Sequence, residues 1–398
     1  MEKESESGPL IIDDEDRYSR LRLIGWWDQE RIAAAKVLVV GAGALGNEVL
    51  KNLALLGVGN IYLIDFDTVD ETNLTRSVLF RHGDAGQPKA DVASRMVREI
   101  NPDCQVRYLA GNVLTELGIG LIRDLDVAIG CLDNREARLW LNRMCWKGNT
   151  PWIDGGIQEI NGVAKVFRPP GGACYECAMT DLDYQLISLR YSCPLLKQED
   201  ILQGKVPTAP TIASIIGGMQ VQEALKIIHE LPSIDGAALV FNGAANRFYE
   251  TQYPIKEDCL SHETYDEPIE LDLSAAETTV CQLFEAVGKA TGNSSTRLRL
   301  DRDFLLSLNC RTCESELPIG EPTCLVDAKR GLCSECQQPM TPNTINSIDA
   351  EGDHGEHLGK TLRQVGIPDY DIVKVESESD VAFVLLGKDR DSFGELAS

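Results

Sequence analysis

The sequence predicts an α/β fold built on a mainly parallel sheet, and two observations support this prediction. From residue 36 to residue 154, short apolar runs alternate with amphipathic helical patterns, as expected for β–α–β units with right-handed crossovers. Three of the apolar runs end in a glycine or an acid, at Gly41, Asp65 and Asp133. Because ligand groups collect at the carboxyl ends of parallel strands, we expect these residues to face one site.

The stretch from residue 36 to residue 89 indicates what this site binds. Val37–Val40 runs into Gly41-Ala-Gly43-Ala-Leu-Gly46, and a helical pattern and a second strand pattern ending in Asp65 follow. In such a Rossmann-like unit the first glycine makes the turn, the second admits a phosphate and the third lets the helix pack on the strand. The acid then meets the ribose hydroxyls. These residues alone also fit a plain glycine turn or a nicotinamide-dependent dehydrogenase.

The residues after Asp65 favour ATP over a dinucleotide. Arg76 and Lys89 supply cations, which an enzyme acting on a triphosphate needs to neutralise charge that develops on the phosphates. Asp133 follows a third apolar strand, and an acid beside polyphosphate suggests a Mg²⁺ ligand. The candidate nucleotide-binding residues are Gly41, Gly43, Gly46, Asp65, Asp67, Asn73, Arg76, Gln87, Lys89, Asp133 and Asn134.

Composition narrows the class of protein. The formal charge of −24 over 398 residues argues against nucleic-acid binding, since phosphate backbones require a basic face. The sequence has no apolar stretch long enough to span a bilayer and no signal-peptide pattern at its start. Seven of the 13 cysteines fall in Cys-x-x-Cys or Cys-x-x-His spacings, which suits metal sites in a reducing compartment. We therefore expect a cytoplasmic protein.

Taken together and in order, the motifs resemble the adenylation domain of the ubiquitin-activating enzyme superfamily, which includes the sulfur-carrier adenylyltransferases of molybdopterin and thiamine synthesis. The resemblance covers residues 17–262. The matching segments are Arg17–Arg20, Gly41–Gly46, Asp65–Asp67, Asn73–Arg76, Gly86–Lys89, Leu132–Asn134 with Ala137 and Arg138, and Cys174–Cys177. This resemblance implies an enzyme that uses ATP and Mg²⁺ to adenylate a ubiquitin-like protein. Arg20, Arg76, Lys89 and Asp133 are its implied catalytic side chains, with Arg20 reaching the neighbouring subunit of a homodimer.

Two groups of cysteines predict zinc sites. Cys174 and Cys177 lie on a tight turn and make half of a tetrahedral site. The resemblance implies that a second pair completes it; here that position holds Cys259 and His262, a departure from the usual four cysteines. The second group is Cys310, Cys313, Cys333 and Cys336, whose two Cys-x-x-Cys pairs, 19 residues apart, predict a structural zinc ribbon.

Cys193 is the candidate nucleophile. It lies in the crossover segment, residues 184–211, that precedes a long helical pattern, where the superfamily carries its reactive cysteine. A thiol there could take the acyl group as a thioester. A buried structural thiol is the alternative, and sulfur-carrier adenylyltransferases also have a cysteine in this region.

The remaining chain predicts a flexible acidic segment at residues 1–16 and a second domain at residues 269–398. That domain looks like a small α+β ubiquitin-like fold with the zinc ribbon inserted at residues 308–340. The resemblance implies that it recruits a conjugating enzyme. Two other functions stay open: a sulfur-carrier adenylyltransferase, and a non-catalytic regulatory or scaffold subunit of an activating enzyme.

Overall fold

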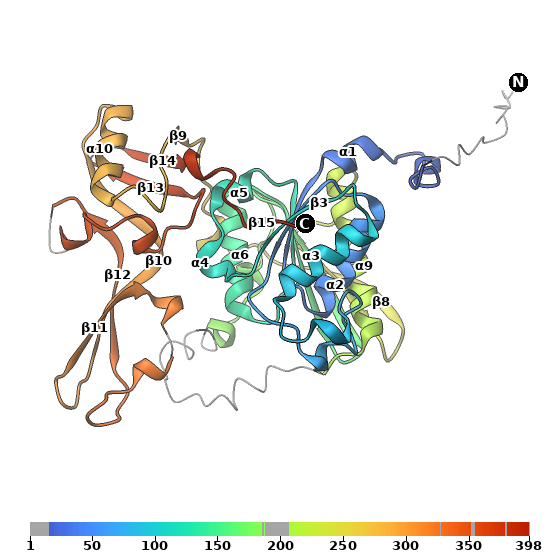
Figure 1. Ribbon diagram of the computed structural model, residues 1–398, viewed down its shortest axis with the longest axis horizontal. Coiled ribbons are helices and arrows are strands. Elements are labelled where there is room, and N and C mark those ends of the chain that lie inside the picture. Colours follow the sequence, from blue (N-terminus) through green and yellow to red (C-terminus); the bar gives the residue numbers. More distant parts are fainter. Residues whose placement is uncertain are drawn as a thin grey trace, which may run out of the picture.

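The computed structural model describes residues 16–184, 187, 207–326, 328–351, 355–378 and 380–397. These residues form two sheets, each with its own hydrophobic core (Figure 1). Within these ranges, no helix combines the length and apolar character needed to cross a membrane.

The first sheet has nine strands in the order β15-β3-β2-β1-β4-β5-β6-β7-β8. Its strands are β1 (Lys36–Val40), β2 (Asn60–Ile64), β3 (Gln105–Leu109), β4 (Val127–Gly130), β5 (Trp152–Gln158), β6 (Asn161–Phe167), β7 (Ala237–Asn242), β8 (Arg247–Gln252) and β15 (Glu395–Leu396). Strands β1 to β5 pair in parallel, which confirms the α/β prediction for the glycine-loop half. In the other half the pairs β5–β6, β6–β7 and β7–β8 are antiparallel, so the sheet as a whole is mixed and the prediction of a mainly parallel sheet holds only for β1 to β5.

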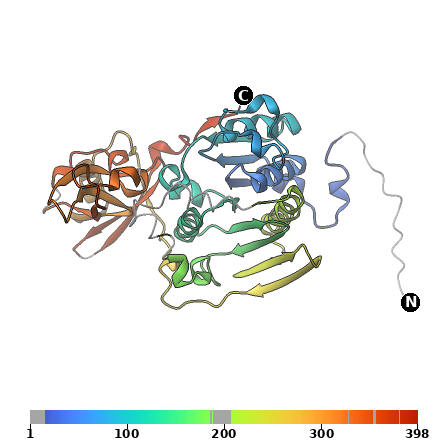
Figure 2. The ribbon, with the colours of Figure 1, turned by 90° about the horizontal axis from the view of Figure 1, so that it is seen from below.

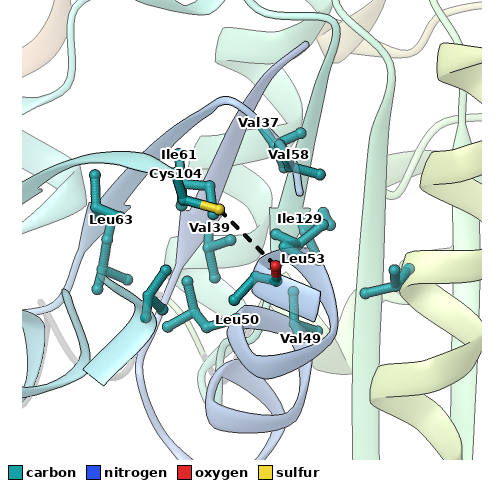
Figure 3. Packing of buried hydrophobic residues seen from close by; sticks show 14 of the residues in the cluster. Val37, Val39, Val49, Leu50, Leu53, Val58, Ile61, Leu63, Cys104 and Ile129 are labelled. Atoms are coloured by element: carbon teal, nitrogen blue, oxygen red, sulfur yellow. Dashed lines mark hydrogen bonds between the residues drawn. The ribbon is translucent and has the colours of Figure 1, made fainter. Parts of the chain in front are cut away.

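Helices cover both faces of this sheet (Figure 2). The helices α2 (Ala44–Leu56), α3 (Lys89–Ile100) and α9 (Pro210–Ile228) lie on one face, and α4 (Val113–Glu116), α5 (Ile119–Arg123) and α6 (Arg135–Lys147) on the other. Alternate residues of β1 serve the two faces, so Val37 and Val39 meet α2 while Leu38 and Val40 meet the opposite core. Figure 3 shows Val49, Leu50 and Leu53 of α2 packed against β1 and its neighbours.

Two helical stretches of the first unit are interrupted. The helical spacing at residues 17–35 resolves into a 3₁₀ turn at Leu21–Leu23 and a short helix, α1 (Gln29–Ala34), which Asp28 caps by accepting a hydrogen bond from the Arg31 N–H. The helical stretch between β3 and β4 divides into α4 and α5 at Gly118. A Cβ at Gly118 would lie 2.4 Å from the carbonyl oxygen of Asp369, so only glycine permits this close approach of two backbone segments.

The second sheet has six strands with α10 (Val280–Thr291) packed on one face. Its strands are β9 (Ile269–Leu271), β10 (Ser295–Asn309), β11 (Glu316–Pro322), β12 (Thr341–Asp349), β13 (Ile372–Ser377) and β14 (Val381–Leu386). The pair β14–β9 is parallel and the others are antiparallel. The long strand β10 pairs with β13 near its start and with β11 near its end, so it carries the sheet outward into the cysteine-rich insert.

The end of the described chain returns to the first sheet. Strand β15 pairs antiparallel with β3, and the Ala397 N–H donates to the carbonyl of Val106 over 2.9 Å. The guanidinium of Arg98, in the last turn of α3, donates to the carbonyl of Ala397. Although residues 269–398 are predicted as one C-terminal domain, this terminal strand lies on the first sheet and joins the second sheet to it.

A buried polar contact also joins the two sheets. Arg302 of β10 is 9% exposed; its guanidinium stacks on the Trp140 ring at 4.2 Å and donates to the carbonyls of Leu114 and Leu117. Asp371, 4% exposed, accepts a hydrogen bond of 2.8 Å from the Ile119 N–H. The second sheet is therefore held on α4 and α5 through backbone groups.

Asp371 predicts a pH-dependent stability. Burial raises its pKa to about 6, although the charge of Arg302 opposes this. A carboxyl whose pKa is raised by folding stabilises the native state below its unfolded pKa and loses that contribution as the pH rises through the folded pKa. Relative to Asp371→Asn, the wild type should therefore lose up to about 3 kcal/mol of unfolding free energy between pH 4 and pH 7. Urea titrations of both proteins across this range would measure the difference; parallel curves would contradict it.

Candidate functional site

The glycine loop joins β1 to α2 and has the shape that the sequence predicts. Gly41 has φ +97°, and a Cβ there would lie 2.6 Å from the carbonyl oxygen of Cys131. A Cβ on Gly46 would lie 1.9 Å from the carbonyl oxygen of Gly41. Gly43 caps α2, and a Cβ there would meet nothing within 4 Å. The loop is thus closed on the sheet side and open at the helix N-terminus, where phosphate binds in such units.

Asp65 ties this loop to β2. Its Oδ2 accepts a hydrogen bond of 2.6 Å from the Ala42 N–H, and its Oδ1 accepts one of 2.8 Å from the Asp67 N–H. Burial raises the pKa of Asp65, while these bonds and the charge of Lys89 act against the rise. The carboxylate therefore organises the turn from which Asp67 projects.

The two cations predicted to bind phosphate, Lys89 and Arg76, lie on segments beside this turn. Lys89 is the first residue of α3, and its Nζ forms a 2.7 Å ion pair with Asp67. The Lys89 side chain is 11% exposed, so its charge is held in place. Arg76 is partly exposed and donates to the carbonyl of Thr72 over 2.9 Å. Asn73 and Gln87 stabilise their own loops: Asn73 accepts from the Asp70 N–H, and Gln87 accepts from Arg95.

Asp133 is exposed three residues after the end of β4, and Asn134 caps α6 by accepting from the Ala137 N–H over 2.8 Å. Arg138 holds this corner in place. Its guanidinium donates to the carbonyls of Leu132, at 2.6 Å, and Gly155, at 3.0 Å. It also forms a 2.9 Å ion pair with the fully buried Asp154.

Asp154 is a site residue that the sequence reasoning missed. Its Oδ2 pairs with Lys165 of β6 at 3.0 Å, so one buried carboxylate neutralises part of the charge of two cations. The sequence did offer a signal for Asp154, because it follows an apolar run, Pro151–Ile153, as the other predicted acids follow theirs. Asp154 thereby holds in place the guanidinium of Arg138, which also binds the carbonyl of Leu132 next to Asp133.

The first cysteine cluster brings together Cys174, Cys177, Cys259 and His262, whose ligand atoms all lie within 4.8 Å of one another. The Cys174 and Cys259 sulfurs are 3.5 Å apart, and the Cys177 sulfur is 3.4 Å from His262 Nε2. In a tetrahedral zinc site with bonds of about 2.3 Å, neighbouring sulfurs are about 3.8 Å apart. The cluster could therefore hold zinc after a small expansion.

The surroundings orient this cluster. The His262 ring stacks on Trp146 with centroids 4.9 Å apart and planes 17° apart, and burial lowers its pKa, which favours the neutral form that binds metals. Beside it, the buried carboxylate of Glu176 accepts from Arg143, Tyr184 and Ser261. Because Glu176 directly precedes Cys177 and Ser261 directly precedes His262, these bonds hold together the two segments that carry the ligands.

The second cluster lies in the insert between β10 and β12. Cys310 and Cys336 have sulfurs 3.4 Å apart, as do Cys313 and Cys333, and all four sulfurs lie within 4.8 Å. Four thiolates complete a tetrahedron and leave no position for a substrate. This cluster can hold a metal in a structural role.

The model of the ThiF family matches residues 16–261. The chain therefore belongs to the ThiF family. It is 31% identical over 254 residues to the SAMP-activating enzyme E1 of Haloferax volcanii, covering 61% of this chain and 87% of that protein. It is 37% identical over 164 residues to SUMO-activating enzyme subunit 2 of Dictyostelium discoideum, covering 41% and 25%. Adenylyltransferase and sulfurtransferase MOCS3 of Drosophila persimilis is 31% identical over 243 residues, covering 60% and 51%.

The chain thus spans a quarter of the SUMO-activating subunit and about half of MOCS3. Among solved structures, E. coli MccB with ATP is similar with TM-score 0.51 and 22% identity, covering 63% of this chain and 75% of that one. MccB in complex with N-formylated MccA gives TM-score 0.53 and 24% identity, covering 64% and 77%. These likenesses confirm a Rossmann-like adenylation fold, and the family match confirms the predicted superfamily.

Two predicted site residues are not brought into this ThiF-family site. Arg20 is exposed on the N-terminal segment, and its side chain has no hydrogen bond or ion pair to the described part of its own chain. Cys193 lies outside the described residues. Both roles stay predictions.

The exposed carboxylate of Asp133 fits Mg²⁺, which takes one or two carboxylates and completes its shell with water and phosphate oxygens.

The two clusters predict two zinc ions per chain. Elemental analysis of the purified protein should find about two, and Cys336→Ser should reduce the number to about one, because three ligands bind zinc more weakly than four. His262→Cys should keep two, since a thiolate can replace the imidazole. Zinc content near zero in the wild type, or unchanged content in Cys336→Ser, would contradict the assignment.

Proposed function

We propose that this ThiF-family chain uses ATP to adenylate the C-terminal carboxylate of a ubiquitin-like protein and then holds the acyl group on Cys193 as a thioester. The observation that carries the proposal is the ion pair of Lys89 with Asp67, held beside the open glycine loop with Arg76 nearby in the chain. Fixed cations at a phosphate-binding edge serve phosphoryl chemistry, whereas a dinucleotide site has no use for them.

The residues have distinct roles in the adenylation step. Gly41, Gly43 and Gly46 give the phosphates access to the N-terminus of α2, and Asp65 holds the loop and faces the ribose. A carboxylate oxygen of the ubiquitin-like protein attacks the α-phosphorus. The bond from that phosphorus to the oxygen bridging to the β-phosphate breaks, and pyrophosphate leaves. Lys89 and Arg76, with Arg20 from the partner of a homodimer, stabilise the charge on the departing phosphates.

Asp67, Asn73, Gln87 and Asn134 shape the loops around the nucleotide, and Asp133 would hold Mg²⁺. When bound, Mg²⁺ neutralises charge on the phosphate oxygens. In the second step the Cys193 thiolate attacks the acyl carbon of the adenylate, a thioester forms and AMP leaves. The similarity to SUMO-activating and SAMP-activating enzymes supports a ubiquitin-like substrate.

The second sheet would receive the next partner. Its helix packed on a mixed sheet, with β9 and β14 parallel, is compatible with the expected ubiquitin-like fold. We propose that it docks a conjugating enzyme, and that the zinc ribbon stiffens the insert at residues 308–340. The similarity to MOCS3 supports an alternative in which the adenylate goes on to a thiocarboxylate. A non-catalytic regulatory or scaffold subunit is disfavoured by the complete set of cations.

If the adenylation step depends on Lys89, replacing this lysine should lower ATP–pyrophosphate exchange. Lys89→Met should lower carrier-dependent ATP–pyrophosphate exchange by about 100-fold or more, because the cation that stabilises the departing phosphates is gone. Lys226→Met is the matched control, since Lys226 also pairs with a neighbouring carboxylate, Glu223, at 2.5 Å but lies on α9 outside the site. Equal exchange in both variants would contradict the role of Lys89, and no exchange in the wild type would favour the scaffold alternative.

The thioester step predicts a covalent adduct. With ATP, Mg²⁺ and a carrier ending in exposed glycine, the wild type should form a reductant-sensitive adduct on a non-reducing gel, and Cys193→Ala should not. Both proteins should retain pyrophosphate exchange, because the cysteine acts after adenylation. Exchange in both without any adduct would move the assignment to the sulfur-carrier adenylyltransferases.

A further inference from the structure

Asn47 is a fully buried polar residue of the first turn of α2, and the adenylation mechanism does not use it. Its side-chain amide donates to the carbonyl of Ala42 over 2.7 Å and to that of Gly43 over 3.0 Å. Its Oδ1 accepts from the Leu79 N–H over 2.8 Å. Both amide hydrogens and the amide oxygen are therefore bonded, and all three partners are backbone groups.

The three bonds join two loops that carry site residues. Ala42 and Gly43 belong to the glycine loop. Leu79 follows Arg76 by three residues in a segment that is anchored in the core, since Leu79 and Phe80 are only 2% and 4% exposed. Among the described residues, the Asn47 side chain supplies the hydrogen bonds recorded between these two loops.

The chemistry of the bonds suits a phosphate site. A carbonyl oxygen pointing at a phosphate would repel it, whereas an N–H attracts it. Because Asn47 is buried, the carbonyls of Ala42 and Gly43 that it binds are turned into the protein. The Ala42 N–H is fixed on the other side by Asp65. The peptide groups of the loop are therefore oriented before nucleotide arrives, which lowers the cost of binding.

We propose that Asn47 is a positioning residue that ties the phosphate-binding loop to the Arg76 segment, so that nucleotide bound by one loop finds the arginine of the other in place. Only an amide of this length provides two donors and one acceptor here: aspartate has no donor, and leucine has neither. The inference rests on the proposed adenylation function and adds a coupling between two of its parts.

The test compares Asn47→Leu with a matched loss of a buried hydrogen bond elsewhere. Leucine is of similar size and uncharged, so it removes the three bonds without adding charge. Thr150→Val is the control: Thr150 is 1% exposed and donates to the carbonyl of Ile122 over 2.7 Å. It lies just before the start of β5, whereas the glycine loop follows the end of the parallel strand β1. Calorimetry with a non-hydrolysable ATP analogue and thermal melting are measured for both variants and the wild type.

We expect both variants to melt at lower temperature, but only Asn47→Leu to weaken binding of the ATP analogue, by about tenfold, because buried backbone groups of the loop lose their partners. Hydrogen exchange should rise at the Leu79 amide in Asn47→Leu and stay unchanged there in Thr150→Val. If Asn47→Leu does not fold, Asn47→Ser, which can keep one bond, should show the same changes to a smaller extent.

A double-mutant cycle with Arg76→Ala tests the coupling itself. If Asn47 acts partly through Arg76, the rate of pyrophosphate exchange in the double variant should lie within about threefold of the lower single variant. Fully multiplicative losses, or equal weakening of ATP binding in Thr150→Val, would overturn the inference. Wild-type protein that binds no ATP would instead refute the proposed function, so the two failures are distinguishable.

Discussion

The close approach of α2 to β1 is the constraint on which the nucleotide site depends. Gly46 leaves 1.9 Å between the carbonyl oxygen of Gly41 and the position where a Cβ would stand, so a side chain there would move the helix away from the strand. Such a shift would separate the helix N-terminus from Asp65 and would break the bonds of Asn47. The apolar contacts of Val49, Leu50 and Leu53 hold α2 at this distance. Burial of these three side chains stabilises the packing of the helix on the strand.

A second constraint fixes how the two sheets are joined. Arg302 and Asp371 bind backbone groups of α4 and α5, and β15 extends the edge of the sheet next to β3. The second sheet is therefore held at three backbone segments of the first unit. Polar contacts of this kind are demanding in geometry, so they define one arrangement of the two sheets. The face of the first sheet that carries α2, α3 and α9 takes no part in the Arg302 and Asp371 contacts.

Local patterns determined most of what the sequence could predict. The glycine loop, the acids after β2 and β4, and the Cys-x-x-Cys pairs were visible because spacing along the chain reports directly on a turn or a pair of ligands. The pairing of Cys174 and Cys177 with Cys259 and His262 was implied only by the resemblance to the superfamily. The contacts of Asn47, Asp154 and Arg302 were not visible, since each joins segments whose proximity depends on tertiary packing. The parallel order ends at β5 for a local reason: the turn at Glu159, with φ +53°, sends the chain back antiparallel along β5. The break at Gly118 reflects the approach of Asp369, over 250 residues away.

The two cysteine clusters are built differently, and this difference bears on what each can do. Cys174 and Cys177 are buried within the core that also contains Trp146 and Trp152, and Cys259 and His262 come from a segment about 85 residues away. Closing that long loop restricts the unfolded chain strongly, so a metal there would hold the segment with Cys259 and His262 against α6. The second cluster closes a loop of 26 residues in a small satellite core. With so little apolar surface around it, that insert depends more on its metal to hold one shape.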